Sequence, residues 1–185
     1  AKEPPKMDFI SLMDPDPATA DMDDMEYLGN LILLIVGGND TTRNSMSASI
    51  YATNLFPTEW DKVKANRDLI PNAVEEIVRL TTPIRALSRY VAEDVEMHGV
   101  TMKKGDRLIV VFASGNRDEN VFPQPDTFDV TRKTHKHMGF GQGVHMCMGM
   151  HLARRELGAL LHALTVHVKS VTCADDGKIA LNNTI

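Results

Sequence analysis

The order of apolar and polar positions predicts two long helices. The first begins among acidic side chains near residue 21, where a helix N-terminus favours negative charge, and continues through the apolar stretch Leu31–Val36 to about Leu55. At ~1.5 Å per residue it would be about 50 Å long, and Pro57 ends it. The second helix covers residues 148–168, because its leucines recur at the spacing that buries one helix face.

Shorter elements are predicted between these helices. Prolines delimit two short helices, and apolar runs bounded by turns indicate three short strands. Proline-rich or aperiodic segments are expected to be loops, with one helical turn at residues 9–13. The predicted helices are 58–66 and 71–82, the strands are 87–91, 95–97 and 107–112, and the loops are 1–18 and 119–139. The fold class is therefore mainly α with a minor β part.

The composition is that of one ordinary globular domain. Of the 185 residues, 43% are apolar and 24% are charged, and the net charge of −5 argues against a nucleic-acid partner. The longest unbroken apolar run is far too short to cross a bilayer, so no membrane span is expected. Two cysteines and no signal peptide favour a reducing compartment, and we expect a cytoplasmic protein.

The strongest chemical signal is a glycine-rich loop that carries one cysteine, in residues 140–149. Its glycines allow the backbone to pass closely beneath a flat cofactor, where Cβ atoms have little room. Cys147 precedes the last predicted helix, and the unpaired N–H groups and the dipole of a helix N-terminus favour thiolate over thiol. Such a thiolate suits iron, and His145 can reach an anionic group at the cofactor's edge.

Two other interpretations of Cys147 remain open. A disulfide with Cys173, the second cysteine, is formally possible. A zinc site is the stronger alternative because several histidines lie near Cys147 in the sequence, although zinc ligands normally come in closely spaced pairs. These histidines are His135, His137, His145 and His151.

Two further motifs carry candidate polar groups. Gly37 and Gly38 lie in the middle of the first helix at a cost of about 1 kcal/mol each, so either another helix packs closely there or a ligand needs the room. A hydrogen bond from Thr41 to the Gly37 carbonyl would bend the helix, and Asp40 adds an acid beside this hydroxyl. The second motif, Glu76–Arg79, places opposite charges on one helix face, as a solvated surface pair or as a buried one.

In this order along the chain, the motifs resemble those of the cytochrome P450 family. Phe140–Gly149 is similar to the family's haem-thiolate loop. Gly37–Thr41 resembles the oxygen-activating segment of its helix I, and Glu76–Arg79 resembles its helix-K motif. The similarity covers about residues 21–185 and implies a partial domain, the C-terminal half of the P450 fold from helix I to helix L with short strands. The N-terminal half and the last strands would lie outside this chain.

The resemblance also implies which residues hold the cofactor, heme b (iron protoporphyrin IX). Cys147 would be the axial iron ligand, and Arg89 and His145 would bind the two propionates. Asp40 and Thr41 would control the delivery of protons to oxygen. The other implied cofactor contacts are Gly37, Gly38, Phe140, Gly141 and Gly149, and the implied structural network is Glu76, Arg79 and Arg132.

The implied activity is that of a monooxygenase, which inserts one oxygen atom of O2 into an unactivated C–H bond. Its two electrons would come from NAD(P)H through a ferredoxin or similar redox partner on the Cys147 side. Leu31–Ser45 is similar to helix I of bacterial alkane-hydroxylating P450s, which implies terminal hydroxylation of medium-chain alkanes or similar small apolar substrates. Arg85, if it pointed into the pocket, would favour a carboxylate or polar substrate, so a fatty-acid or terpenoid hydroxylase is the alternative.

A zinc-binding module or a non-catalytic haem-binding module is the alternative of another class. The chain by itself is expected to be inactive as an enzyme. Much of the cofactor's rim would face water, and the first helix would expose the apolar face that a complete protein buries.

Overall fold

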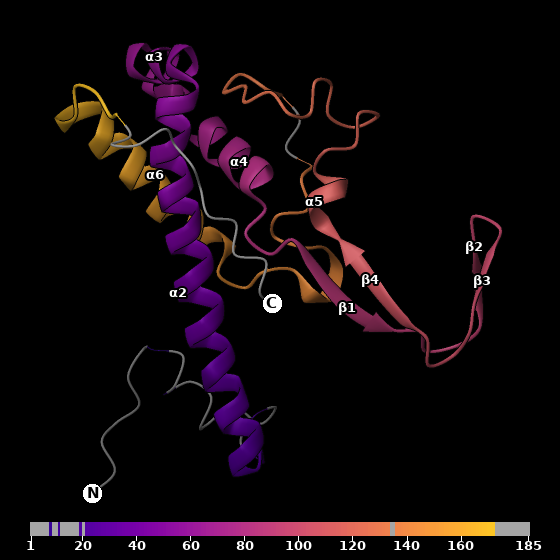
Figure 1. The fold of residues 1–185 in the computed structure, drawn as a ribbon. Coiled ribbons are helices and arrows are strands. Elements are labelled where there is room, and N and C mark those ends of the chain that lie inside the picture. Colours follow the sequence, from indigo (N-terminus) through magenta and orange to yellow (C-terminus); the bar gives the residue numbers. More distant parts are fainter. Residues whose placement is uncertain (1–7, 9–10, 12–18, 20, 134–135, 173–185) are drawn as a thin grey trace, which may run out of the picture. The chain divides into compact units, whose positions relative to one another are not determined.

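The computed structural model describes residues 8, 11, 19, 21–133 and 136–172 (Figure 1). Its contacts divide the chain into two compact units, residues 1–41 and residues 42–185. Helix α2 (Asp24–Leu55) gives its first part to one unit and its last part to the other. Two long helices and a mainly α composition with a minor β part are confirmed.

In the first unit, α2 begins at Asp24 rather than at residue 21. The Asp23 carboxylate accepts hydrogen bonds from the backbone N–H groups of Met25 (2.9 Å) and Glu26 (2.8 Å), which satisfies donors that a helix start leaves unpaired. Of the turn expected at residues 9–13, only Ser11 is described, and it is helical; the other four residues lie outside the described part.

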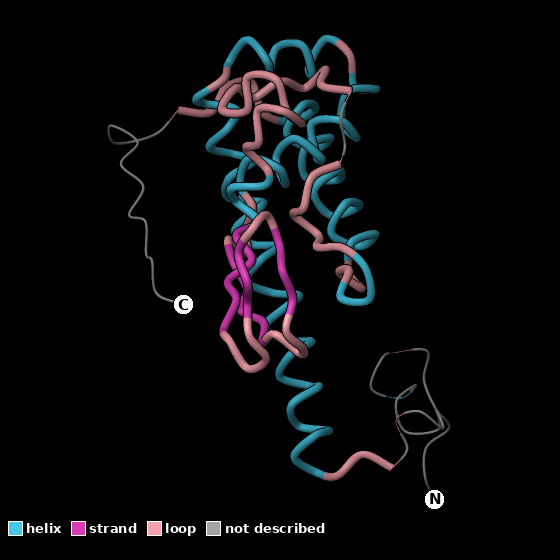
Figure 2. The backbone as a smooth tube through the Cα atoms, turned by 90° about the vertical axis from the view of Figure 1, so that its right-hand side faces the viewer, coloured by secondary structure: helices cyan, strands magenta, loops and turns pink. Residues whose placement is uncertain are grey.

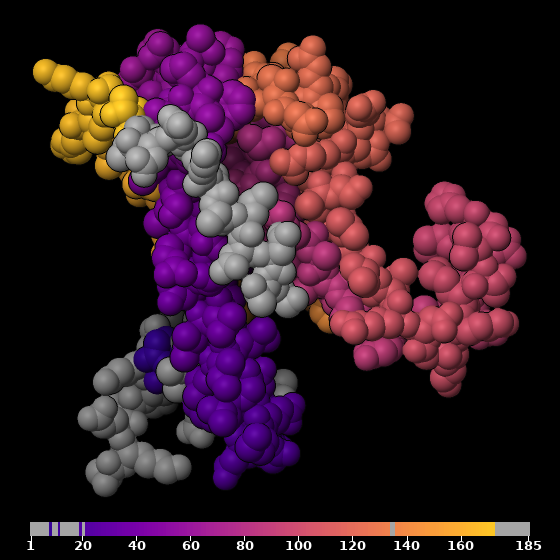
Figure 3. All heavy atoms as spheres, viewed as in Figure 1, coloured from indigo at the N-terminus to yellow at the C-terminus, as the bar shows by residue number. Residues whose placement is uncertain are grey.

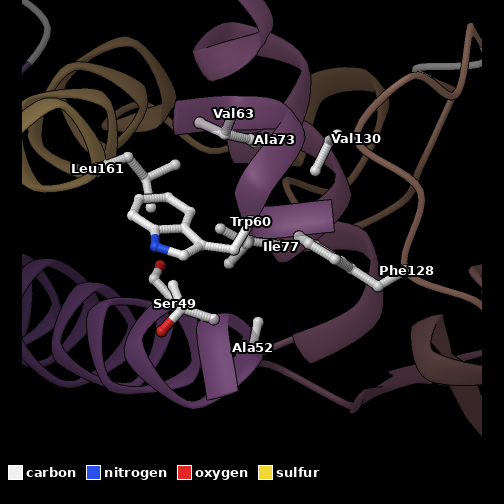
Figure 4. A pocket seen from close by; sticks show the side chains of 10 residues that line it. Ser49, Ala52, Trp60, Val63, Ala73, Ile77, Phe128, Val130 and Leu161 are labelled. Carbon is white, nitrogen blue, oxygen red and sulfur yellow. The ribbon is translucent and has the colours of Figure 1, made fainter. Parts of the chain in front are cut away.

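The core of the second unit lies between α4 (Ile70–Thr81) and α6 (Met150–His167), with α3 (Pro57–Ala65) and the end of α2 beside them. Figure 4 shows side chains from all four helices meeting there, among them Trp60, Ile77 and Leu161, which are at most 8% exposed. Burying each such side chain contributes about 1.5–3 kcal/mol. The short 3-10 turn η1 (Arg67–Leu69) joins α3 to α4.

The β part consists of two separate antiparallel pairs, drawn in magenta in Figure 2. Strand β1 (Ala86–Tyr90) pairs with β4 (Arg107–Val111), and β2 (Val95–Met97) pairs with β3 (Val100–Met102). β3 was not among the predicted strands, although its partner β2 was. The turn before it contains His98 and Gly99 with φ of 51° and 77°, values that a tight hairpin requires.

Residues 116–142 contain no helix or strand in their described part, and this range includes the loop predicted for residues 119–139. They are nevertheless held in place, because the buried side chains of Phe122, Phe128 and Val130 pack beneath them. The Val130 N–H donates a hydrogen bond to Glu59 of α3 (3.2 Å), and the space-filling view shows this segment in orange against α3 (Figure 3). The segment therefore packs as part of the second unit.

Several predicted boundaries shift by one or two residues. Phe112 belongs to a short helix, α5 (Phe112–Gly115), rather than to the preceding strand. α6 begins at Met150 rather than Met148, because Gly149 is its N-cap and η2 (Gly143–His145) takes up the preceding loop. Within the described ranges, no helix combines the length and the apolarity that crossing a membrane requires.

Candidate functional site

The loop before α6 is closed by its own backbone. The Cys147 N–H donates to the Phe140 carbonyl (2.8 Å), so the chain returns to its starting point over seven residues, and the Gly141 N–H donates to Met138 (2.9 Å). Gly141 and Gly143 have φ of +70° and +68°, a region that residues with a Cβ rarely adopt. The glycines predicted to shape this loop thus serve its backbone geometry.

The Cys147 thiol is free and exposed at the mouth of this loop. Its backbone carbonyl accepts from the Met150 N–H (3.4 Å), so the cysteine lies in the turn immediately before α6. Apolar side chains beside it also face outward: Val144 is 97%, Met148 66% and Met146 47% exposed. An exposed thiol among uncovered apolar side chains fits a flat apolar cofactor.

The donor groups near Cys147 fit haem better than zinc. In the described part of the chain, no three His, Cys, Asp or Glu side chains gather closely enough to hold a metal ion. His145 and His151 are exposed, whereas His137 is buried and bonded to Glu75 (2.8 Å). His135 and Cys173 lie outside the described residues. A haem iron needs one thiolate from the protein on its proximal side, whereas structural zinc needs four ligands.

The two predicted propionate ligands lie on separate elements. Arg89 is half-buried on β1, and its Nη1 donates to the carbonyl of Ser88 (2.8 Å). His145 ends η2 with its side chain exposed. No hydrogen bond between the two is found among the described residues, so their joint role stays a prediction.

The glycine pair of α2 lies in the first unit. Thr41 Oγ1 donates to the Gly37 carbonyl at 2.6 Å, the back-bond that the sequence suggests. A Cβ placed on Gly37 or Gly38 would meet no atom within 4 Å, so nothing in the described residues packs against these two glycines, which form a notch in the helix surface. Neighbouring apolar side chains of α2 are uncovered, including Leu33 (69% exposed) and Val36 (60%). The roles predicted for Asp40 and Thr41 remain predictions.

Glu76 and Arg79 form a buried ion pair on α4 rather than a solvated one. Arg79 is 1% and Glu76 3% exposed, and the Arg79 guanidinium donates to both Glu76 oxygens at 2.7 and 2.8 Å. The remaining Arg79 donors go to backbone carbonyls of Asn116, Pro125 and Thr127. The pair therefore fixes a segment that has no secondary structure of its own.

Arg132 enters the same network from that segment. Its Nε donates to Glu76 Oε1 (3.0 Å), and its other nitrogens donate to the carbonyls of Pro123, Gln124 and Thr127. Two buried guanidinium groups, those of Arg79 and Arg132, thus share the single carboxylate of Glu76. Their other hydrogen bonds go to backbone carbonyls, which are neutral acceptors. Such a site holds together only while all its partners are present, because each charge is desolvated.

A second set of contacts links α4 to the start of the cysteine loop. Asn116 is fully buried; its amide donates to Thr82 (2.8 Å) and its oxygen accepts from the Met138 N–H. Gly139 lies so close to α4 that a Cβ there would stand 2.6 Å from a methyl of Val78. The loop that ends at Cys147 is thus built directly on α4.

The sequence profile of the family described as Cytochrome P450 matches residues 2–178. The chain belongs to the cytochrome P450 family. Its helices and short strands are accordingly part of a P450 fold, with the cysteine loop leading into α6.

Similar proteins and solved structures support this assignment. Linalool 8-monooxygenase of Pseudomonas putida is 42% identical over 144 residues, covering 78% of this chain and 36% of that protein. The structure of CYP153D17 from Sphingomonas sp. PAMC 26605 matches with 46% identity and a TM-score of 0.84, over 89% of this chain and 42% of that one. The structure of Cytochrome P450-153 from Novosphingobium aromaticivorans matches with 41% identity and a TM-score of 0.82, over 84% of this chain and 40% of that one. The chain thus spans about two fifths of the length of these P450s.

Three residues that hold the cysteine loop in place were missed in the sequence: Glu75, Asn116 and Gly139. Each acts through a partner distant in the chain, so no local spacing reveals it. The one available signal in the sequence was that Glu75 directly precedes Glu76. Consecutive residues of a helix point about 100° apart, so the two acids face different neighbours.

Proposed function

We propose that the chain carries the proximal haem site and helix I of a haem-thiolate monooxygenase, with Cys147 as the iron ligand. The observation that supports this most is the exposed Cys147 thiol at the end of a closed glycine loop, directly before α6. Bound haem supplies the activation of O2 and the insertion of one oxygen atom into a C–H bond. The chain's residues hold this cofactor and manage protons around it.

The polar residues divide into two tasks under this proposal. Arg89 and His145 bind the propionates, one as a guanidinium and the other as an imidazole donor. Asp40 and Thr41 hold and pass protons toward the O2 substrate, and Thr41 already holds its hydroxyl proton against the Gly37 carbonyl. Reducing equivalents from NAD(P)H reach the Cys147 side through a ferredoxin or similar partner.

For the substrate we propose a medium-chain alkane or similar aliphatic chain, hydroxylated at or near its end. The similarity of Leu31–Ser45 to helix I of alkane-hydroxylating P450s supports this choice. So do the uncovered apolar side chains of α2 at Leu33, Ile35 and Val36, which themselves carry no charge for a carboxylate or an amine. Dispersion and desolvation would then supply most of the binding.

The assignment of Cys147 is tested by Cys147→His in the full-length protein. We expect the carbon monoxide band of the reduced protein to move to the position of imidazole-ligated haem, because the nitrogen donates less electron density than the thiolate. Cys173→Ser is the matched control and should leave the band in place. Stoichiometric zinc without haem, or the same band in Cys147→His as in the wild type, would mean that Cys147 is not the ligand.

The substrate is tested by turnover with octane, a fatty acid and a monoterpene, using a ferredoxin and its reductase. Octane should give mainly the terminal alcohol. Arg85→Leu should leave octane turnover within about twofold if the substrate is held by apolar contacts alone. Turnover of the terpene without any alkane product, or fatty-acid turnover that is lost in Arg85→Leu, would reject the alkane while leaving the monooxygenase intact.

A further inference from the structure

Glu75 binds the chain on both sides of the cysteine loop. Its carboxylate takes two hydrogen bonds from Arg154 of α6, at 2.6 and 3.1 Å, and one from His137 at 2.8 Å. His137 lies ten residues before Cys147 and Arg154 seven residues after it. One carboxylate on α4 thus joins the chain entering the loop to the helix leaving it.

The hydrogen-bond directions in this cluster are fixed by the backbone. His137 Nδ1 accepts from the Gly139 N–H (3.1 Å), so Nε2 carries the ring proton and donates it to Glu75. Burial alone would raise the pKa of Glu75, but the hydrogen bonds from His137 and Arg154 and the charge of Arg154 outweigh it and hold the pKa at about 2. Glu75 is therefore an anion at any physiological pH.

Phe140 contacts both partners of Glu75. Its ring centroid is 4.6 Å from the Arg154 guanidinium carbon and 5.7 Å from the His137 ring. These are the distances of a cation–π contact and of a packed aromatic pair. The Phe140 carbonyl accepts the hydrogen bond from the Cys147 N–H (2.8 Å). A continuous path of contacts therefore leads from Glu75 to the backbone of Cys147.

We propose that Glu75 is a positioning residue for Cys147: by holding His137 and Arg154 it clamps Phe140, and Phe140 fixes the backbone from which the sulfur projects. The consequence for iron ligation rests on the function proposed above, whereas the fixing of the Cys147 backbone does not. Glu76, the next residue, turns to Arg79 and Arg132 instead. Adjacent acids on α4 thus hold two different segments.

The proposal is tested by hydrogen exchange at the Cys147 amide in the full-length protein as purified. Glu75→Ala should speed this exchange by about tenfold or more, and Glu75→Gln, which keeps one acceptor, by less. Val63→Ala is the matched control for a mere loss of stability, because it shortens a 1% exposed core side chain of α3. Glu93→Gln, at an exposed turn, controls for the loss of one negative charge.

The route through Phe140 is tested by a double substitution. In a Phe140→Leu background, Glu75→Gln should change the Cys147 amide exchange by less than about twofold, because the link is already broken. In haem-loaded protein, Glu75→Ala and Glu75→Gln should also convert part of the thiolate-type carbon monoxide band to the band of haem without a thiolate, well below the unfolding temperature.

The outcomes separate this proposal from the proposed function. Amide exchange in Glu75→Gln equal to that in Val63→Ala, at equal loss of stability, would leave Glu75 an ordinary packing contact and overturn the proposal. Faster exchange in a protein whose wild type shows no thiolate-type band would support the clamp and refute the haem assignment. If Glu75→Ala does not fold, Glu75→Gln decides, since it preserves the size of the side chain.

Discussion

Arg79→Ala is expected to lower the free energy of unfolding by about 3–5 kcal/mol, out of a typical total of about 5–15 kcal/mol. Arg79 is 1% exposed and donates to both oxygens of Glu76. Without it, Glu76 Oε2 loses this donor inside a buried site, whereas Oε1 keeps the N–H groups of Arg132 and Asp129. The carbonyls of Asn116 and Pro125 lose a donor as well.

The measurement is urea unfolding of the full-length protein, followed by the yield of haem-loaded material. Arg79→Lys should fall between wild type and Arg79→Ala, because an ammonium keeps the charge but cannot reach all of these acceptors at once. Lys103→Ala is the control, since Lys103 pairs with Asp94 at the surface, with 67% and 56% of their side chains exposed. An Arg79→Ala protein as stable as Lys103→Ala would show that the buried network is dispensable.

The helices could be predicted because their signals are local. Acidic residues open α2, Pro71 opens α4, and leucines of α6 repeat at the spacing of one buried face. The pair β2 and β3 shows the limit of such signals. β2 was predicted from its residues, whereas β3 was not, and it is recognised as a strand by its pairing with β2.

The cysteine loop was equally local, because its glycines and Cys147 follow one another within ten residues. The contacts that hold the loop in place are not local. Gly139 needs to be glycine because of Val78, sixty-one positions earlier, and Arg79 finds its carbonyl acceptors thirty-seven to forty-eight positions later. These contacts arise only when α4, residues 116–132 and the loop pack together. A pattern read along the chain therefore identifies the reactive group but not its support.

Thr41→Ala should leave haem bound and reductant consumption intact while cutting product per reductant by about tenfold or more, since a positioned proton donor contributes about 10²–10⁴-fold. The Thr41 hydroxyl, 2.6 Å from the Gly37 carbonyl, is held at the glycine notch by its own helix. The alanine variant keeps the backbone, but position 41 then has no hydroxyl to hold a proton for the O2 substrate. The reducing equivalents should then appear as hydrogen peroxide.

Two matched variants make this test specific. Thr41→Ser keeps the hydroxyl and should restore most of the coupling, whereas Thr42→Ala makes the same change one position along α2 and should behave as wild type. Asp40→Asn should slow turnover and raise its solvent isotope effect, because an amide cannot release a proton as a carboxylic acid does. If Thr41→Ala and Thr42→Ala gave equal peroxide yields, the Thr41 hydroxyl would have no role in proton delivery. Gly37, Gly38 and Thr41 would then serve helix packing.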